Sequence, residues 1–480
     1  MPHLACYAAK QMKKASLFLV LFALTLAGAS TPPQLNGAFR RPEKNGWIFV
    51  HLQGQPAQIG FQHGYLLAPE IEDFLRITRV SLPHDSGKSW DFFREAARTV
   101  FLPHVETQYR EELQGIVDGL NAHGVHADLI DIVILNALPE TSPYYTEWYD
   151  KHHPLLSAAA HPRPVPEHCS AFAATGSYTR DGRPVIAHNN WTDYADGARW
   201  NIIFDIVPSA GHRILMDGPP GLIHSGDDFG VNDAGLVITE TTIGYFHGFD
   251  PDGIPEFVRA RKAMQYATNV DEFAAIMKEG NNGGYANTWL VADMHAGEIG
   301  SLELGLKHVT LERTKDGYFV GSNFPANPEL IRDETNFPAA DKGISSNARH
   351  ARWVQLMEKN KGRIDLASAQ RFLSDHFDVI DKKNEPSERT LCGHIDLSAR
   401  GSNPWQPAYG PAGAVQNKAA DAALALRMSF NAAMGHACGI SFHAAQHLQQ
   451  HPQFGWEKDI LRDLIASPWT TFAAASGPQQ

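Results

Sequence analysis

The spacing of apolar residues changes at Cys169, and this change constrains the fold more than any other feature of the sequence. Before Cys169, apolar residues recur with a helical period, whereas after it short apolar runs are separated by turn residues, as in antiparallel strands. The predicted helices before it are residues 68–80, 90–100, 105–123 and 127–138, preceded by a strand at 46–52. The predicted strands after it are residues 170–178, 185–189, 200–207, 212–216, 235–242, 288–293, 299–304 and 308–313.

Helical patterns return among and after these strands. The predicted later helices are residues 256–267, 270–278, 351–359, 366–377, 419–433 and 457–464. Helices on either side of a block of strands indicate an α+β layered fold. We therefore expect a mostly helical N-terminal portion, residues 30–168, ending in a Pro-rich linker at 139–168. A second portion, residues 169–480, starts at the cysteine.

Composition excludes several classes of function. The formal charge of −12 and the absence of a basic stripe argue against a nucleic-acid partner, because phosphate binding requires concentrated Lys and Arg. The sequence has no G-x-S-x-G elbow, P-loop or G-x-G-x-x-G signature. We therefore expect neither a serine-based α/β-hydrolase nor a nucleotide-binding protein of the usual types. No low-complexity hinge divides the 480 residues, so we expect one large domain or two closely packed layers.

The first 29 residues have the pattern of a secretory signal peptide. Lys13 and Lys14 precede an apolar run at residues 17–26, and the small residues 27–29 follow it. A buried N-terminal helix would explain neither the lysine pair nor the small residues. The run is short for a membrane-spanning helix. We therefore expect a secreted or periplasmic protein with no transmembrane segment.

The number of cysteines leaves their pairing open. Removal of the leader removes Cys6 and leaves Cys169, Cys392 and Cys438. Three is an odd number, so at least one thiol stays free in an oxidising compartment. Pairing of Cys392 with Cys438 would leave Cys169 free, but all three could equally be buried and reduced.

Cys169 directly follows the Pro-rich linker at residues 139–168, and linkers of this composition are exposed and accessible to proteases. This position suits a nucleophile that becomes the first residue of a chain when the linker is cut. Cleavage between His168 and Cys169 would place a new α-amino group on the residue that carries the sulfur. That amine, with a pKa near 7.7–8.0, can act as the base that generates the thiolate. Acyl transfer also needs hydrogen-bond donors for the oxyanion. The candidate donors are Asn189, Asn190 and Asn287.

Spacing alone supports a structural interpretation of each candidate as well. Cys169 could be a small buried hydrophobic residue and His188 a core histidine bonded to backbone. Asp227 and Asp228 could cap or form a turn, and Trp191 and Trp289 could be core residues. His443 and His447 have metal-ligand spacing but lack the Glu of H-E-x-x-H. We therefore expect no metal and no cofactor.

Five motifs occur in an order that resembles the phospholipase B-like family. They are His168-Cys169-Ser170-Ala171, Ala187-His188-Asn189-Asn190-Trp191, Ser225-Gly226-Asp227-Asp228-Phe229, Gly235-Leu236-Val237 with Glu240-Thr241-Thr242-Ile243, and Asn287-Thr288-Trp289-Leu290-Val291-Ala292-Asp293. This family is part of the N-terminal-nucleophile hydrolases and is related to their penicillin acyltransferase-type branch. The resemblance covers residues 167–293, with fainter similarity at 390–396 and 435–464.

The resemblance implies a four-layer αββα sandwich and a precursor cut between His168 and Cys169. It makes Cys169 the nucleophile and base and Asn287 an oxyanion donor, with His188 and Trp191 lining the site. The residues expected to orient substrate or to support the site are Asn189, Asn190, Asp227, Asp228, Thr241 and Trp289.

These observations predict a secreted, self-processing hydrolase that cleaves an acyl ester or amide through a Cys169 thioester. The acyl group is expected to be lipid-like or otherwise apolar, so the partner is a small molecule or a lipid. One alternative is an acyltransferase that passes the acyl group to an amine. Another is a processed, non-catalytic lipid-binding protein. The sequence does not determine the oligomeric state.

Overall fold

The computed structural model describes residues 32–154, 169–226, 229–402 and 405–476. Residues Gln34–Gln480 form one unit by their internal contacts. The predicted leader at 1–29, most of the predicted linker, His168, Asp227 and Asp228 lie outside the described residues. Within the described part of the chain, no helix is long and apolar enough to cross a membrane.

The larger sheet has nine strands and draws on both portions of the chain. In spatial order they are β1 (Phe39–Arg40), β2 (Ile48–Gly54), β5 (Ile202–Pro208), β6 (Ile214–Gly218), β7 (Gly230–Asn232), β8 (Leu236–Thr242), β9 (Asn287–Asp293), β10 (Glu298–Leu304) and β11 (Val309–Thr314). β2 pairs with β5 in parallel, and the other neighbours pair antiparallel. The N-terminal portion therefore supplies two strands to the same sheet as the later portion.

The smaller sheet has six antiparallel strands and includes the strand that follows Cys169. Its order is β12 (Gly317–Gly321), β3 (Ser170–Thr175), β4 (Val185–Asp193), β15 (Ala412–Asp421), β16 (Ser429–Met434) and β17 (Thr470–Ala473). β3 and β4 contact β8 of the larger sheet. A short separate ribbon pairs β13 (Phe377–Asp378) with β14 (Lys383–Asn384).

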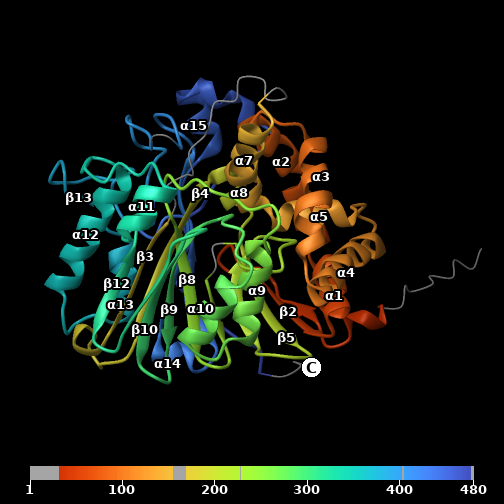
Figure 1. Ribbon diagram of the computed structural model, residues 1–480, viewed down its shortest axis with the longest axis horizontal. Coiled ribbons are helices and arrows are strands. Elements are labelled where there is room, and N and C mark those ends of the chain that lie inside the picture. The colour runs from red at the N-terminus through yellow and green to blue at the C-terminus, as the bar shows by residue number, and fades with distance from the viewer. Residues whose placement is uncertain (1–31, 155–168, 227–228, 403–404, 477–480) are drawn as a thin grey trace, which may run out of the picture. The chain divides into compact units, whose positions relative to one another are not determined.

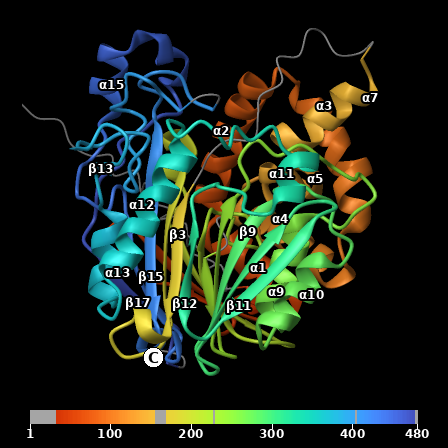
Figure 2. The ribbon, with the colours of Figure 1, turned by 60° about the vertical axis from the view of Figure 1, so that its left-hand side comes forward.

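Helices pack against both sheets. α9 and α10 contact strands of the nine-stranded sheet, whereas α12 and α13 contact strands of the six-stranded sheet. Figure 2 shows the strands between these two helix pairs, and Figure 1 shows α1 to α5 gathered beside β2 and β5. The α-helices are α1 (Pro56–Leu66), α2 (Ala68–Ser86), α3 (Trp90–Ala96), α4 (Thr107–His123), α5 (Leu129–Asn136), α6 (Leu138–Glu140), α7 (Thr146–His152), α8 (Tyr194–Gly197), α9 (Glu256–Tyr266), α10 (Val270–Lys278), α11 (Pro328–Glu334), α12 (Ser345–Lys359), α13 (Leu366–Leu373), α14 (Ala422–Ala425) and α15 (Ala444–Gln450). Shorter 3-10 or π-helical turns are η1 (Pro33–Leu35), η2 (Ala97–Phe101), η3 (Leu102–His104), η4 (Thr141–Tyr145), η5 (Gly176–Tyr178) and η6 (Pro452–Glu457).

Glycines allow α1 and α4 to pack with their backbones in close approach. A Cβ atom added at Gly60 would lie 1.9 Å from the carbonyl oxygen of Glu112, and one added at Gly119 would lie 2.2 Å from that of Phe61. Both distances are far below van der Waals contact, so only glycine fits at these positions. The helical layer that covers β2 is therefore fixed by direct backbone contact between helices.

The α+β class is confirmed, whereas three local predictions are wrong. Residues 419–433 form the end of β15, the short α14 and most of β16, because the small alanines that favour a helix locally are buried in a sheet. Residues 457–464 do not form the predicted helix. Glu457 is the last residue of a 3-10 helix, and Leu464 forms an isolated β-bridge with Phe442. The first part of the predicted linker, residues 139–152, is largely helical, and Tyr144 and Tyr145 are buried.

Candidate active site

Cys169 lies directly before β3, fully buried and in a strained backbone conformation. Its φ angle is +75°, a left-handed value that residues with a side chain rarely adopt. The thiol donates toward Asn190 Oδ1 at 3.6 Å and lies 3.9 Å from Glu240 Oε1. Asn190 comes from β4 and Glu240 from β8, so the cysteine lies where the two sheets meet.

Polar side chains hold both of these neighbours. Asn190 Nδ2 donates to Gln416 Oε1 at 2.8 Å, and Gln416 in turn donates to the carbonyl oxygen of Gly197 at 2.7 Å. The Tyr285 hydroxyl donates to Glu240 Oε1 at 3.0 Å. The amide and the carboxylate beside the thiol are therefore oriented by the protein before any substrate binds.

His188 belongs to the same cluster. One nitrogen of its ring, the Cys169 sulfur and a Glu240 oxygen all lie within 4.8 Å of one another. Burial, followed by the positive charge of Lys418, lowers the pKa of His188 well below its ordinary value, so the imidazole is neutral at physiological pH. Lys418 itself pairs with Asp217 at 3.0 Å, and both side chains are fully buried. This ion pair joins β15 of one sheet to β6 of the other beside His188.

Arg349, on α12, holds the backbone of Cys169. Its Nη1 donates to the Cys169 carbonyl oxygen and, at 3.1 Å, to Ser170 Oγ. Nη2 donates to Asn323 Oδ1 at 2.8 Å, and the guanidinium carbon lies 4.3 Å from the centre of the Trp191 ring. The arginine is fully buried, so its charge is placed in a site with little water.

Asn287 and Thr241 lie on neighbouring strands of the larger sheet. Asn287 begins β9 opposite Thr242, two residues along β8 from Glu240. Its amide is buried and makes no hydrogen bond among the described residues, which leaves its donors available. Thr241 packs against Gly321 of β12, where an added Cβ would lie 2.5 Å from Thr241 Oγ1. Thr241 thus contacts the second sheet.

The other predicted residues make contacts that hold the scaffold. Asn189 donates from Nδ2 to the carbonyl oxygens of Leu373 and Leu391, each at 2.9 Å. Trp289 packs against Phe273 of α10 at 5.6 Å between ring centres. Trp191 lies between Arg349 and Gly393.

A cavity of about 550 Å³ reaches this cluster. Asn190, Thr242 and Tyr285 are among its lining residues, and much of the remaining wall is aromatic or aliphatic. The apolar wall includes Phe74, Leu82, Leu138, Tyr144, Trp200, Leu222, Trp405, Phe454, Trp456 and Ile460. Four carboxylic acids, Asp85, Asp193, Asp196 and Glu457, also line it. The volume and the mainly apolar wall suit a small molecule with a hydrocarbon part.

Glu240, Tyr285, Arg349 and Gln416 were not among the residues predicted to form the site. Glu240 carries one signal in the sequence, since it is a lone carboxylate inside the strand-like run at residues 236–242. Arg349 stands in an ordinary helical pattern, and only the fold brings it to Cys169.

The remaining cysteines and histidines lie elsewhere. Cys392 and Cys438 are free thiols, so the possible disulfide between them is not formed. His443 Nδ1 lies 3.1 Å from Asp463, whereas the ring of His447 packs against aromatic neighbours, including Phe454.

Comparison with known proteins gives a family match over most of the chain. The model of the family described as Phospholipase B matches residues 95–467. An uncharacterised protein of Archaeoglobus fulgidus is 24% identical over 54% of this chain and 43% of its own length. Putative phospholipase B-like 2 of Mus musculus is 26% identical over 58% of this chain and 53% of its own length. Phospholipase B-like 1 of Homo sapiens is 23% identical over 52% and 49%, respectively. The chain thus spans about half the length of the curated relatives it matches.

Proposed function

Because the chain belongs to the phospholipase B family, we propose that it hydrolyses an acyl ester or amide with an apolar acyl group. Cys169 is the nucleophile in this proposal, after the chain has cut itself between His168 and Cys169. The observation that carries it is the position of the Cys169 thiol, 3.6 Å from an asparagine that lines a mainly apolar cavity.

Self-cleavage begins with attack of the Cys169 sulfur on the carbonyl carbon of His168. The peptide C–N bond breaks, the departing nitrogen takes a proton, and a thioester links His168 to the sulfur. Water then hydrolyses the thioester, which releases a free thiol and a free α-amino group on Cys169. The positive φ of Cys169 and the hydrogen bond from Arg349 to its carbonyl oxygen support this step, because both hold the backbone in a conformation it would not otherwise prefer.

Turnover uses the groups that cleavage releases. The α-amine accepts the thiol proton, and the thiolate attacks the acyl carbonyl carbon to form a tetrahedral intermediate. Asn287 is the proposed donor to the oxyanion, since its amide is buried and has no other hydrogen bond among the described residues. The departing alcohol or amine takes the proton back from the α-ammonium group. Water then deacylates the thioester. The carboxylate of Glu240, which lies 3.9 Å from the Cys169 sulfur, is the proposed partner of the α-ammonium group.

The four-layer αββα arrangement of N-terminal-nucleophile hydrolases is part of the same proposal. It is supported by β3 and β4 packing on β8, with helices against each sheet. Export of the protein from the cytoplasm is also proposed, on the signal-peptide pattern of residues 1–29.

The two fragments should stay together after the cut. Seven residues of β2 pair with β5 across the cleavage point in the sequence, from Ile48 opposite Ile202 to Gly54 opposite Pro208. We therefore expect the fragments to co-elute in size exclusion and to separate only in denaturant.

Intact mass and N-terminal sequencing of the purified protein test the cleavage. The expected result is a fragment that starts at Cys169, with first-order kinetics that do not depend on protein concentration. Cys169→Ala should stay uncut and inactive while keeping the melting temperature of the uncut wild-type chain, and Cys169→Ser should cut slowly if at all. An uncut wild-type chain that still turns over substrate would exclude the α-amine mechanism.

A panel of matched esters and amides with acyl chains of increasing length tests the reaction. Free fatty acid is the expected product, with an apparent specificity that favours chains long enough to fill the cavity. Addition of an amine acceptor separates transfer from hydrolysis, because a transferase would form the amide product at the expense of the free acid. Binding of lipid by the processed chain with no turnover would identify a binding protein instead.

A further inference from the structure

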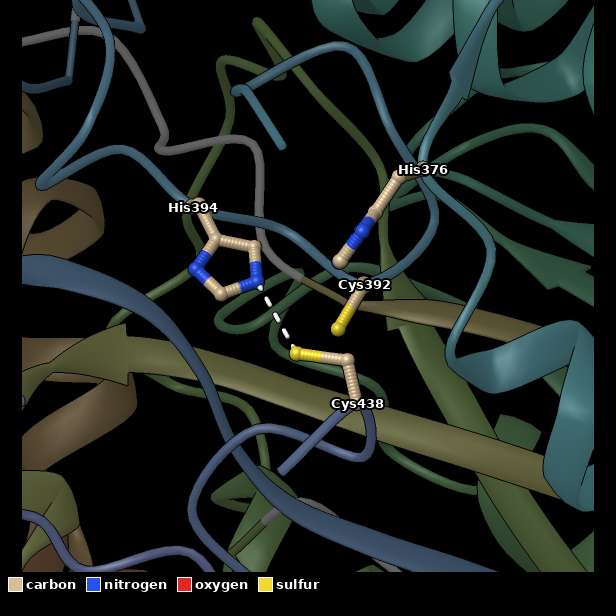
Figure 3. Close-up of side chains that lie close together, drawn as sticks. All are labelled: His376, Cys392, His394 and Cys438. Atoms are coloured by element: carbon tan, nitrogen blue, oxygen red, sulfur yellow. Dashed lines mark hydrogen bonds between the residues drawn. The ribbon is translucent and has the colours of Figure 1, made fainter. Parts of the chain in front are cut away.

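Two cysteines and two histidines converge away from the candidate active site. Their side chains are His376, Cys392, His394 and Cys438, called here the His2Cys2 cluster (Figure 3). Each offers one nitrogen or sulfur atom, and these four atoms all lie within 4.8 Å of one another. Cys438 Sγ lies 3.5 Å from His394 Nε2.

We propose that the His2Cys2 cluster binds one Zn²⁺ ion as a closed structural site. Two thiolates and two imidazoles are a tetrahedral donor set that zinc prefers. With Zn–S near 2.3 Å and Zn–N near 2.0–2.1 Å, neighbouring donor atoms in a tetrahedron lie roughly 3.3–3.8 Å apart. The separations in the cluster are close enough to reach these values through small side-chain rotations.

The surroundings of the cluster suit a bound cation. His376 Nε2 is buried and makes no hydrogen bond among the described residues, so it is available as a ligand. His394 directs Nε2 to the cluster and has Nδ1 3.9 Å from Asp396 Oδ1. A carboxylate beside the second ring nitrogen is the usual outer partner of a zinc-bound histidine. The Tyr194 hydroxyl donates to the same Asp396 oxygen at 2.9 Å and holds it in place.

The four donors differ in burial in a way that leaves a path for the metal. Cys392 and His394 are fully buried, whereas His376 and Cys438 are partly exposed. An ion can therefore enter from the side of the last two residues and end against the first two.

The cluster joins three segments that lack extensive secondary structure. His376 follows α13, Cys392 and His394 lie between β14 and β15, and Cys438 lies in the turn after β16. Backbone hydrogen bonds already bring the segments together, since the Cys392 amide donates to the Asp375 carbonyl oxygen at 3.1 Å. A zinc ion would fix the loop between β14 and β15, for which the described residues form only turns and isolated bridges.

That loop packs against β4, the strand that carries Asn189, Asn190 and Trp191. The Leu391 carbonyl oxygen accepts from Asn189, and Gly393 lies so close to Trp191 that an added Cβ would be 2.2 Å from the indole ring. With four protein ligands, the proposed zinc site has no open position for a substrate, so its role is structural. It stabilises β4, the strand that carries Asn190.

Metal analysis of the full-length protein, purified without added chelator, tests the proposal. We expect one zinc per chain, displaced by a strong chelator with a fall in melting temperature that added Zn²⁺ reverses. Co²⁺ added to the chelated protein should give the intense visible absorption of tetrahedral thiolate coordination. Cys438→Ser should lose most of the zinc and the thiolate-to-cobalt absorption.

Two control variants separate this site from other ligands in the chain. His443→Gln removes an exposed histidine with metal-like spacing to His447, and Cys169→Ala removes the thiol of the active-site cluster. Both should keep one zinc per chain. If Cys438→Ser does not fold, the chelation and Co²⁺ measurements on the wild-type chain decide. A metal-free protein that gains no Co²⁺ absorption would overturn the proposal, as would a disulfide between Cys392 and Cys438 or zinc lost only with Cys169→Ala.

Discussion

The guanidinium of Arg349 donates a hydrogen bond to the main-chain carbonyl oxygen of Cys169 across 180 positions of sequence. The same side chain also bonds Ser170, Asn323 and Ser345, so its planar group is held at several points. A residue of α12 thereby restrains the backbone of Cys169, the proposed nucleophile, directly before β3.

Arg349→Lys should slow self-cleavage. Lysine keeps the charge but cannot reproduce the forked set of hydrogen bonds, so the Cys169 backbone loses its restraint. One charge-assisted hydrogen bond contributes about 1.5–3 kcal/mol, which corresponds to a loss of about tenfold or more in the cleavage rate. The rate is measured by gel or mass spectrometry on freshly purified precursor.

Arg352→Lys is the matched control, because Arg352 lies on the same helix and pairs with Asp375 at 2.6 Å instead of contacting Cys169. Its cleavage rate should equal that of the wild type. Equal slowing in both variants would mean that the effect comes from general damage to α12.

Substitution of Asn287 should affect catalysis, whereas substitution of Asn189 should affect folding stability. Asn287→Ala should lower kcat by about 10²–10³ with little change in melting temperature, since its amide makes no hydrogen bond among the described residues of the free protein. Asn189→Ala breaks two hydrogen bonds to carbonyl oxygens and should cost about 1–3 kcal/mol of folding stability. Processed protein is compared by steady-state kinetics and thermal unfolding. A large loss of kcat for Asn189→Ala at unchanged stability would contradict this division.

The sequence predicts the cluster only in part, because its residues become neighbours through the pairing of distant strands. Cys169, His188 and Asn190 are close in sequence and share the β3–β4 hairpin, so a local motif locates them. Arg349 and Gln416 reach them from α12 and β15. No local pattern distinguishes such residues from an exposed helical arginine or a surface glutamine.

The fold was predictable where the hydrophobic period is strong. The helix at residues 105–123 and the strands at 235–242 and 288–293 agree closely with α4, β8 and β9. Residues 419–433 are alanine-rich and favour a helix by propensity, yet tertiary packing makes most of them strand. The His2Cys2 cluster was not predicted either, since its residues come from three separate segments of the sequence and do not match a common metal-binding motif.

Gly60→Ala should destabilise the protein strongly without any direct effect on the active site. The new methyl group would lie 1.9 Å from the Glu112 carbonyl oxygen, so α1 and α4 must separate. Overpacking of this kind costs about 1–3 kcal/mol and lowers the melting temperature by several degrees. Gly455→Ala is the control, because nothing lies within 4 Å of an added Cβ there and its melting temperature should stay near the wild-type value. Equal melting temperatures for the two variants would show that α1 and α4 are not in close contact.

Folding stability should fall as pH rises from mildly acidic to alkaline values. Burial, followed by the charges of Asp85 and Asp196, raises the pKa of Glu457 to about 8. Burial, followed by the charge of Asp85, raises the pKa of Asp196 to about 7. Both folded-state values exceed those of the unfolded chain, so the folded protein holds these protons more tightly. Their stabilising effect is complete below about pH 4 and is lost as pH rises through about 7 to 8.

Glu457→Gln should reduce this loss of stability, because an amide stays neutral when the carboxyl group would ionise beside Asp85 and Asp196. The measurement is the melting temperature of the uncut Cys169→Ala chain between about pH 5 and pH 9, with and without the substitution. We expect the chain that keeps Glu457 to lose at least about 2 °C more than the Glu457→Gln variant over this range. Glu111→Gln, on the exposed face of α4, should leave the profile unchanged. Parallel profiles with and without Glu457→Gln would mean that Glu457 ionises in the folded protein as easily as in the unfolded chain, and that the end of the cavity beside Trp456 is open to water.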